Sequence, residues 1–495
     1  MKRLQSKYHI NAVTVILAAF ALLFASVSIV NHLMFRTYGL DLGIYTNAIY
    51  DYAHLHGNDC SFFRWETQNL LSDHFDLLLA LISPLVYLFG NWTLLIVQIV
   101  AVLVGAYGVY RLVRLYTNSQ TLPLATMLML LTSFGVWHAL GFDYHSNVLS
   151  AMMLPWLLYC VKRQRLVVAT VLLVLMAVAK ETQPVWLTFV LLALMFDYCH
   201  NRRTMWWLAA SALGCVVYTF VVMMWLMPAM GDTGRGFDRY AWMGGNMGEV
   251  AVWMLTHPVQ AVAALFADFT GSGHDSIKIE FYICLLISGG WLAVMKPNYL
   301  LMLVPMVAMK MMSQDTGFWG LGFHYNVEIC TVIVVASTPA LCRIKSVRGQ
   351  TVAAWVAVAL SLLTLIYSVS NPYSPVRKEN VRIYDARHWR QPDFDVETAR
   401  RMLREIPFDA SVCATTMFTP HLATRDSVYI FPMGLTYNAE YFLLLKQHWV
   451  YYKDGSYDEE AMANEVITDT VNYQVVDTDG TLYMVRRRSP RFAAS

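Results

Sequence analysis

Long apolar blocks, separated by polar segments, occupy the chain from about residue 10 to about residue 370. A helix needs about 20 apolar residues to cross the hydrocarbon core of a bilayer. The pattern predicts about eleven membrane-spanning helices, at residues 10–31, 92–115, 121–140, 147–161, 166–180, 184–198, 205–227, 280–295, 298–312, 325–342 and 351–369. The expected fold class is therefore an α-helical polytopic membrane protein.

Basic residues mark every second connection between these blocks. Lys and Arg near span ends stay on the cytoplasmic side of a membrane protein. The marked positions are Lys2, Arg3 and Lys7; Arg111 and Arg114; Lys162, Arg163 and Arg165; Arg202 and Arg203; Lys296; and Arg343, Lys345 and Arg348. Because the alternation does not break, we expect a bacterial inner-membrane protein with a cytoplasmic N-terminus. An odd number of spans then puts the residues after about 370 outside the cytoplasm.

Two of the outer connections are long, residues 32–91 and 228–279. The first contains an apolar stretch, Leu77–Phe89, which has Pro84 inside it and is short for a span. We expect this stretch to be a helix along the outer membrane interface, since a further crossing would invert every later connection.

The last part of the chain has the pattern of a soluble domain. Pro372 and Pro375 open it as a linker. Helices are expected at 396–406 and 458–466, and short strands at 411–415, 427–431, 473–477 and 481–485. The chain is thus divided into a transmembrane domain, residues 1–370, and a small extracytoplasmic α/β domain, residues 371–495.

Composition narrows the function classes. Hydrophobic residues make up 57% of the chain and charged residues 14%, whereas soluble proteins carry about 25% charged residues. The net charge of +2 comes with no basic patch interleaved with aromatic residues, so nucleic acid is not an expected partner. The sequence has no Walker, GxSxG or HExxH motif, which removes the soluble-type ATPase and hydrolase classes.

Acidic residues and histidines gather in the outer connections, next to the spans. Ionisable groups at membrane depth are costly and mark functional sites, although a carboxylate at a helix start can also serve only as a cap. The candidates, with one lysine and one tyrosine beside them, are Asp41, Asp73, His74, Asp143, His145, Lys180, Glu181, His324 and Tyr325.

These residue types suit group transfer from a lipid carrier. A carboxylate can act as a base toward an acceptor hydroxyl, and a phosphate leaving group needs a cation beside it. Lys180 and either Arg235 or Arg239 are candidate cations, and a divalent metal held by Asp, Glu and His ligands is another. The need for a metal cofactor stays open at this point.

Several segments of the chain carry a family resemblance. They are Asp41-Leu42-Gly43-Ile44-Tyr45, Ser72-Asp73-His74-Phe75, Phe142-Asp143-Tyr144-His145, Lys180-Glu181, His324-Tyr325, Pro420-His421-Leu422 and Val428-Tyr429-Ile430-Phe431-Pro432. With them the chain resembles, over most of its length, the bacterial family called domain of unknown function 2079. The order of one span, a long outer loop and a tight series of spans also resembles the C-type superfamily of membrane glycosyltransferases, whose members take sugars from polyprenyl-phosphate donors.

The resemblance implies roles for the candidate residues. Asp41 would be the catalytic base, and Asp143 would assist it or bind a metal. The residues implied in substrate binding are Asp73, His74, His145, Lys180, Glu181, His324 and Tyr325, of which Lys180 and Glu181 would orient or neutralise the donor phosphate. The chain lacks the Asp-x-Asp form of some members, and its second loop does not end in Glu, which weakens the case for a metal-dependent mechanism.

The sequence thus predicts a glycosyltransferase that moves a sugar from a polyprenyl-phosphate donor to a lipid or glycan acceptor on the outer face of the membrane. A lipid or glycan transporter or flippase is the first alternative, and a non-catalytic membrane assembly protein is the second. The chain shows no internal repeat and no charge deep inside its spans, which favours the enzyme over the transporter.

Overall fold

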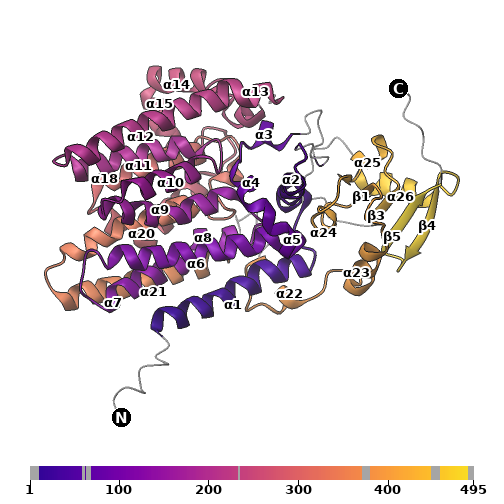
Figure 1. The fold of residues 1–495 in the computed structure, drawn as a ribbon, viewed down its shortest axis with the longest axis horizontal. Coiled ribbons are helices and arrows are strands. Elements are labelled where there is room, and N and C mark those ends of the chain that lie inside the picture. The colour runs from indigo at the N-terminus through magenta and orange to yellow at the C-terminus, as the bar shows by residue number, and fades with distance from the viewer. Residues whose placement is uncertain are drawn as a thin grey trace, which may run out of the picture. The chain divides into compact units, whose positions relative to one another are not determined.

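The computed structural model describes residues 11–57, 62, 69–231, 235–370, 380–446 and 458–488. They belong to two compact units, whose helices and strands are drawn in Figure 1. Unit 1 consists of Met1–Ser28, Asp73–Leu77 and Val97–Arg382, and unit 2 of Ile29–Ser72, Leu78–Ile96 and Ile383–Ser495. The basic N-terminal residues and the linker with Pro372 and Pro375 lie outside the described residues. The domain boundary expected near residue 370 stays a prediction.

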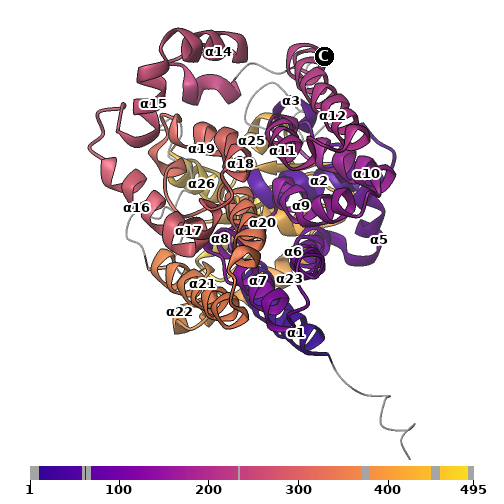
Figure 2. The same cartoon turned by 90° about the vertical axis from the view of Figure 1, so that its left-hand side faces the viewer.

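Unit 1 is built almost entirely from helices, which Figure 2 shows from a second direction. Its helices are α1 (Ala12–Leu33) and α6 (Thr93–Val113), which both extend into unit 2, and α7 (Thr121–Leu131), α8 (Phe134–Leu140), α9 (Ser146–Lys162), α10 (Leu166–Ala177), α11 (Gln183–Tyr198), α12 (Arg202–Val221), α13 (Met227–Ala229), α14 (Met247–Thr256), α15 (Pro258–Phe266), α16 (Asp275–Leu285), α17 (Trp291–Ala293), α18 (Pro297–Leu300), α19 (Val304–Met311), α20 (Val327–Arg343) and α21 (Val347–Ser368). Short 3₁₀ or π turns link some of them, at η4 (Val222–Leu226), η5 (Arg235–Tyr240), η6 (Leu286–Gly290), η7 (Leu301–Leu303) and η8 (Thr316–Phe318).

Among the described residues, five helical runs are long and apolar enough to cross a membrane. They are Ala12–Leu33, Leu78–Val113, Arg202–Ala229, Asp275–Ala293 and Val347–Ser368. Two bent pairs, α7 with α8 and α14 with α15, raise the number to seven if each pair is one span. Helices α10 and α11 are apolar but shorter. The protein is a membrane protein by these criteria, while the expected count of eleven spans is not confirmed.

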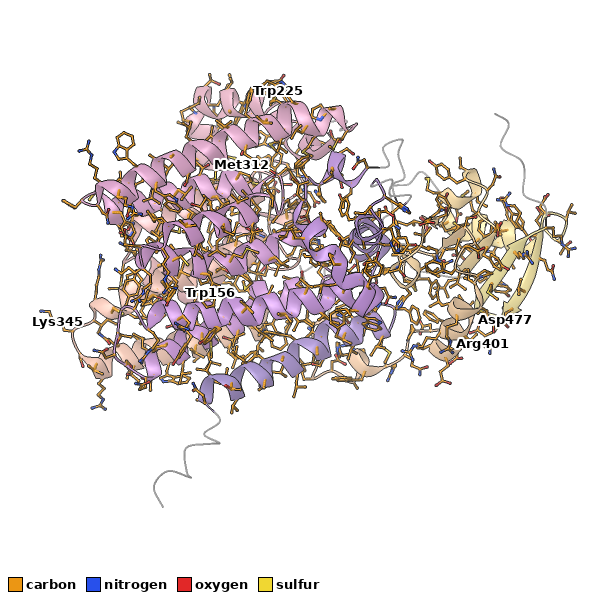
Figure 3. The ribbon with its side chains drawn as sticks, in the orientation of Figure 1. Trp156, Trp225, Met312, Lys345, Arg401 and Asp477 are labelled. Carbon is orange, nitrogen blue, oxygen red and sulfur yellow. The ribbon has the colours of Figure 1, made fainter. Side chains whose placement is uncertain are left out.

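The connections that carry basic residues are joined to one another in unit 1. Lys162 lies over the ring of Tyr116, Asn201 donates to Gln164, Lys296 pairs with Asp197, and Arg343 donates to the carbonyl of Met295. Lys345, labelled in Figure 3, lies in the same set of connections. The alternate connections, 73–77, 141–145, 178–182 and 312–326, are joined to one another by the contacts described below. Each of the two sets of connections is therefore held together by its own contacts, while the side of the membrane on which each lies stays a prediction.

The stretch Leu77–Phe89 forms several short turns of helix. These are α4 (Leu78–Ile82), the 3₁₀ turn η2 (Ser83–Leu85) and α5 (Val86–Phe89). Gly90 follows with a φ of 54°, a conformation that favours glycine, and the turn η3 (Gly90–Trp92) leads into α6. By length and composition, the whole run Leu78–Val113 is one candidate span. The expected position of this stretch along the interface stays a prediction.

Unit 2 contains a five-stranded sheet in the order β2-β1-β3-β5-β4. Its strands are β1 (Val412–Ala414), β2 (Val428–Ile430), β3 (Tyr441–Leu445), β4 (Tyr473–Thr478) and β5 (Leu482–Arg487), and its tail helices are α22 (Ala386–Trp389), α23 (Val396–Glu405), α24 (Thr419–Leu422), α25 (Met433–Thr436) and α26 (Glu459–Thr468). Strand β1 pairs in parallel with β2 and β3, and β5 is antiparallel to β3 and β4. An ion pair between Arg401 on α23 and Asp477 on β4 ties a helix to the sheet (Figure 3).

The expected elements of the tail agree with α23, α26 and four of the strands. The sequence pattern does not predict β3, the strand at the centre of the sheet. Every residue from Tyr441 to Leu445 is buried, so this strand shows a continuous apolar run instead of the alternation that marks a half-exposed strand.

The first outer loop packs against the tail within unit 2. The loop supplies the π turn η1 (Gly39–Gly43), α2 (Ile44–Ala53) and most of α3 (Leu70–Asp73). The Asn47 side chain donates hydrogen bonds to the carbonyls of Ala423 and Arg425 at 3.1 and 3.0 Å. The backbone N–H of Gly39 donates to Oγ1 of Thr416 at 3.1 Å. The tail is therefore a packing partner of the first loop.

Gly39 leaves no room for a side chain against the tail. A Cβ at this position would lie 2.5 Å from Oγ1 of Thr419 and 2.7 Å from Cδ1 of Ile430. We expect Gly39→Ala to lower the free energy of unfolding of unit 2 by about 1–3 kcal/mol, because the crowded atoms must move apart. Thermal unfolding followed by limited proteolysis of the tail measures this loss.

Gly57→Ala is the matched control for this variant, because nothing lies within 4 Å of a Cβ there. The same proteolysis midpoint for both variants would contradict the packing of Gly39 against the tail.

Candidate functional site

Eight of the nine candidate side chains lie in unit 1, and Asp41 lies in unit 2. The eight come from four connections, with two residues in each of the segments 73–77, 142–147, 180–183 and 323–328. These connections are far apart in the sequence, so any contact among their side chains depends on the fold.

Glu181 joins the third of these connections to the first. One oxygen of its buried carboxylate lies 3.6 Å from Nδ1 of His74, and the other accepts the backbone N–H of Phe75 at 3.1 Å. On the other side of the imidazole, Nε2 of His74 lies 3.7 Å from the carboxylate of Asp73. His74 is therefore flanked by two carboxylates, with 31% of its side chain exposed.

The two carboxylates control the charge of His74. Burial lowers the pKa of His74 and the charge of Lys180 lowers it further, but Asp73 and Glu181 outweigh both, so that this pKa is raised above its ordinary value. For Glu181, burial raises the pKa, while the hydrogen bond and charge of His74 and the charge of Lys180 lower it to about 2. His74 thus holds its proton more firmly than a free histidine does. Together with Lys180 it can present positive charge.

Gln98, on α6, shapes the second connection. Its Nε2 donates to the carbonyl of Asp143 at 2.8 Å, and its Oε1 accepts the backbone N–H of His145 at 2.9 Å. Asp143 has a φ of 51°, a left-handed conformation that Asp adopts more readily than most residues. The turn ends at α9, where the hydroxyl of Ser146 donates to the carboxylate of Asp76. That last bond joins the second connection to the first.

Glu328, in the first turn of α20, joins the other connections. Its Oε1 accepts a hydrogen bond from Asn147 at 2.8 Å and one from Gln183 at 3.1 Å, and its side chain is buried. The rings of His145 and His324 stack with their centroids 3.4 Å apart. All four connections are thus bonded together in unit 1. We call this group the loop cluster; it contains Asp73, His74, Asp76, Asp143, His145, Asn147, Glu181, Gln183, His324 and Glu328.

Tyr325 and Lys180 lie at the border of the loop cluster. The half-buried ring of Tyr325 stacks on Phe318 at 4.0 Å and lies against His324 at 4.1 Å. Lys180 is half-buried, and its charge lowers the pKa of both His74 and Glu181. Both residues are therefore placed where a ligand of the cluster could meet them.

Asp41 lies on the π turn η1 of unit 2. Turns of this kind inside helices are frequent at functional sites. Glycines flank it on both sides, and a Cβ on Gly43 would lie 2.7 Å from the ring of Phe62. Asp41 is thus carried by a turn that close packing fixes, within the unit that also contains the tail.

No group of three or more His, Cys, Asp or Glu side chains in the described part of the chain is arranged to hold a metal ion. Whether the protein uses a divalent metal stays an open question. Five members of the cluster or its support have no predicted role: Asp76, Gln98, Asn147, Gln183 and Glu328. Asp76, Asn147 and Glu328 stand beside candidate residues in the same sequence segments, whereas Gln98 and Gln183 are not predicted at all. A polar residue inside an apolar block, such as Gln98, is a signal that could have pointed to one of them.

The His74–Glu181 pair predicts a pH-dependent stability. Since the pKa of Glu181 is lowered, its contribution is lost only as the pH falls toward 2. Since the pKa of His74 is raised, its contribution is full below its unfolded value of 6.5 and is lost as the pH rises through the raised value. We expect His74→Gln to lower the free energy of unfolding by about 0.5–1 kcal/mol near pH 5.5 and by less near pH 8.5.

Thermal unfolding of the purified protein at the two pH values measures this difference. His200→Gln, at an exposed site of the same unit, serves as the control and should lose the same stability at both. A loss that is equal at both pH values for His74→Gln would show that the ion pair does not form.

Comparison with solved structures places the fold. The crystal structure of ArnT from Cupriavidus metallidurans, bound to undecaprenyl phosphate, matches with a TM-score of 0.51 and 13% identity, over 95% of this chain and 97% of that one. Two structures of the oligosaccharyltransferase AglB from Archaeoglobus fulgidus match with TM-scores of 0.47 and 0.44 and 11% identity, over 88% of this chain and 69% of that one. At such low identity the ArnT match shows a shared fold alone.

No curated protein shows significant sequence similarity to the chain. A family model does. The model described as predicted membrane protein of domain of unknown function 2079 (DUF2079) covers residues 31–478, nearly the whole chain. The chain therefore belongs to the DUF2079 family of membrane proteins.

Proposed function

We propose that the protein is a membrane glycosyltransferase that moves a sugar from a polyprenyl-phosphate donor to a lipid or glycan acceptor. The observation that carries the proposal is the loop cluster, in which four connections of unit 1 bring carboxylates and histidines together, with Lys180 at its border. The ArnT structure, which shares the fold, is bound to undecaprenyl phosphate. Polyprenyl phosphate is therefore the first ligand class to test.

The proposed reaction needs a base and a stabilised leaving group. Asp41 takes the proton of the acceptor hydroxyl, whose oxygen then forms a bond to the anomeric carbon of the sugar. The bond from that carbon to the phosphate oxygen breaks, and polyprenyl phosphate leaves with the bonding electron pair. Asp143 is the second residue proposed as catalytic.

Positive charge at the leaving phosphate is assigned to His74 and Lys180. Such charge stabilises the transition state where negative charge develops. Asp73 and Glu181 support this role, because they raise the pKa of His74 and so keep its imidazole charged. His145, His324 and Tyr325 are proposed to contact the substrate with their rings.

The proposed reaction also requires its residues to lie on one face of the membrane. The loop cluster, the first loop with Asp41, and the tail are assigned to the outer face of the bacterial inner membrane, opposite the basic connections. A transporter would carry its charged groups at the bilayer midplane. The placement of the cluster in connections between helices supports the enzyme over the transporter.

Asp41→Asn tests the proposed base. The change keeps the size of the side chain but removes its basicity, so kcat/KM for sugar transfer should fall by about 100-fold or more. The release of polyprenyl phosphate from a series of polyprenyl-phosphate sugars, measured with purified full-length protein and acceptor, gives this value. Asp409→Asn, at an exposed position of unit 2, is the matched control. Equal rates for the two variants would remove Asp41 from the mechanism.

Glu181→Gln tests the proposed charge on His74. Without the Glu181 carboxylate the pKa of His74 falls, so the imidazole loses its proton at a lower pH. The KM for the donor should then rise more steeply between about pH 6 and about pH 8 than in the wild type, while kcat changes less. Glu249→Gln, an exposed change in the same unit, should leave the pH profile unaltered. An unchanged profile for Glu181→Gln would contradict the assignment of His74 to the phosphate.

A further inference from the structure

Two short helices interrupt the long connection between α13 and α16. Helix α14 (Met247–Thr256) and helix α15 (Pro258–Phe266) meet at His257 with a bend of 102° (Figures 1 and 2). Pro258 stands at the first position of α15, where a proline is tolerated and the preceding helix ends. The pair therefore forms a helical hairpin, which we call the α14–α15 hairpin.

One surface of the hairpin is apolar and exposed. Its large side chains are Val252, Leu255, Val259, Val262 and Phe266, with exposed fractions of 57–81%. Between Glu249 and Asp268 the sequence has no Asp, Glu, Lys or Arg. Water-facing helices normally carry charged residues on their outer face. A contiguous group of exposed apolar side chains instead marks contact with a partner or a membrane.

The opposite surface of the hairpin is already packed. Trp253 stacks edge-on against Trp242 with ring centroids 4.7 Å apart, and Nε1 of Trp242 donates to the carbonyl of Met312 at 2.9 Å (Figure 3 labels Met312). Helix α15 also contacts α16 and α19. The hairpin therefore has its place in unit 1, and the exposed surface is left to an outside partner.

The geometry of the hairpin limits how it can meet a bilayer. At 1.5 Å per residue, α14 and α15 are about 15 and about 13 Å long. With a bend of 102° their far ends lie about 18 Å apart, against a hydrocarbon core of roughly 30 Å. The pair is thus too short to cross but long enough for its apex to enter one leaflet.

Both ends of the hairpin are polar. The carboxylate of Glu249 accepts hydrogen bonds from the backbone of Gly245 and the side chain of Asn246. The carboxylate of Asp268 accepts bonds from Thr270, Ser272 and the backbone of His274. At the apex, exposed Leu255 and Val259 stand on either side of Thr256 and His257, whose side chains are bonded to each other and to the carbonyls of Val252 and Trp253. A segment whose ends are polar and whose apex presents apolar side chains, with its polar groups bonded locally, matches a re-entrant loop, whose two ends lie at the same interface.

The alternation of basic connections supports the same conclusion. A single crossing by this pair would move Lys296 and the basic group at Arg343 to the other side from Lys162. These connections are instead joined in space. Lys296 pairs with Asp197 near the end of α11, and Asn201, just before Arg202, donates to Gln164 in the connection that carries Lys162. The chain must therefore enter and leave the hairpin on the same side of the membrane.

We propose that the α14–α15 hairpin is a re-entrant element whose apex, around Leu255 and Val259, inserts into the acyl chains of one leaflet. Lipid is the occupant that fits, because the apolar surface continues onto α16, a candidate span with exposed Ile279 and Ile283. This inference does not rest on the proposed function.

The leaflet is the one on the side of the loop cluster. The base of the hairpin is joined to the connection that carries His324, since the backbone N–H of Gln314 donates to the carbonyl of Arg239 at 2.8 Å. The guanidinium of Arg239 lies over the ring of Phe318, which stacks on Tyr325. A hairpin docked in lipid would therefore set the depth of this side of the cluster.

Site-directed cysteine labelling of the full-length protein in sealed proteoliposomes tests the proposal. Single cysteines at Gly245 and Ser272 probe the two ends, and single cysteines at Leu255 and Val259 probe the apex, in a background whose eight native cysteines are replaced. A membrane-impermeant maleimide should label both ends from the same side. A fluorophore at the apex should be quenched by spin-labelled acyl chains and not by an aqueous quencher.

Two reference positions calibrate the measurement. Leu213, exposed on the candidate span α12, gives the lipid signal, and Val471, exposed in the tail, gives the aqueous signal. Labelling of the two ends from opposite sides would overturn the proposal in favour of a broken span. Quenching of the apex at the level of Val471 would overturn it in favour of a water-exposed hairpin. Each introduced cysteine stands at an exposed position, so the fold is expected to survive these changes. Several native cysteines are buried, and thermal unfolding of the cysteine-free background therefore serves as the check on its fold.

Discussion

A carboxylate removed from water must find donors or cations, or it destabilises the fold. In unit 1 this constraint binds the loops together. Buried Glu181 takes a backbone donor at Phe75 and an ion-pair partner at His74, and buried Glu328 takes two amide donors. Each of these partners belongs to a different connection from the carboxylate it serves. The acids therefore fix the mutual positions of loops that the sequence keeps far apart.

Two features can be predicted from the sequence, because both leave local signals. They are the class of protein and the ionisable residues that stand beside the apolar blocks. Apolar blocks and basic connections are read directly, and Asp73, His74 and Glu181 stand out as charged groups beside apolar runs. Contacts such as Glu328 with Asn147 leave no local signal, since they depend on how α9 and α20 pack. The same limit hides β3, whose buried run resembles a short piece of span. The number of spans is the weakest part of the prediction, because several apolar helices are short or bent.

The tail acquires a structural role from its contacts with the first loop. Gly39 and Asn47 of the loop bind the tail through hydrogen bonds, and Gly39 packs too tightly against Ile430 to accept a side chain. The turn that carries Asp41 is therefore shaped by residues far later in the chain, such as Thr416, which is 377 positions after Gly39. The family match also includes most of the tail, to residue 478.

The central claim is that the protein transfers the sugar of a lipid carrier instead of moving the carrier itself. Sealed proteoliposomes that contain an isotope-labelled polyprenyl-phosphate sugar and a soluble acceptor separate the two activities in one experiment. Mass spectrometry follows the chemical fate of the donor, and accessibility to an external reagent follows its side of the membrane. The account predicts that labelled sugar leaves the donor in step with the appearance of free polyprenyl phosphate. A donor that changes sides and is recovered intact would contradict it.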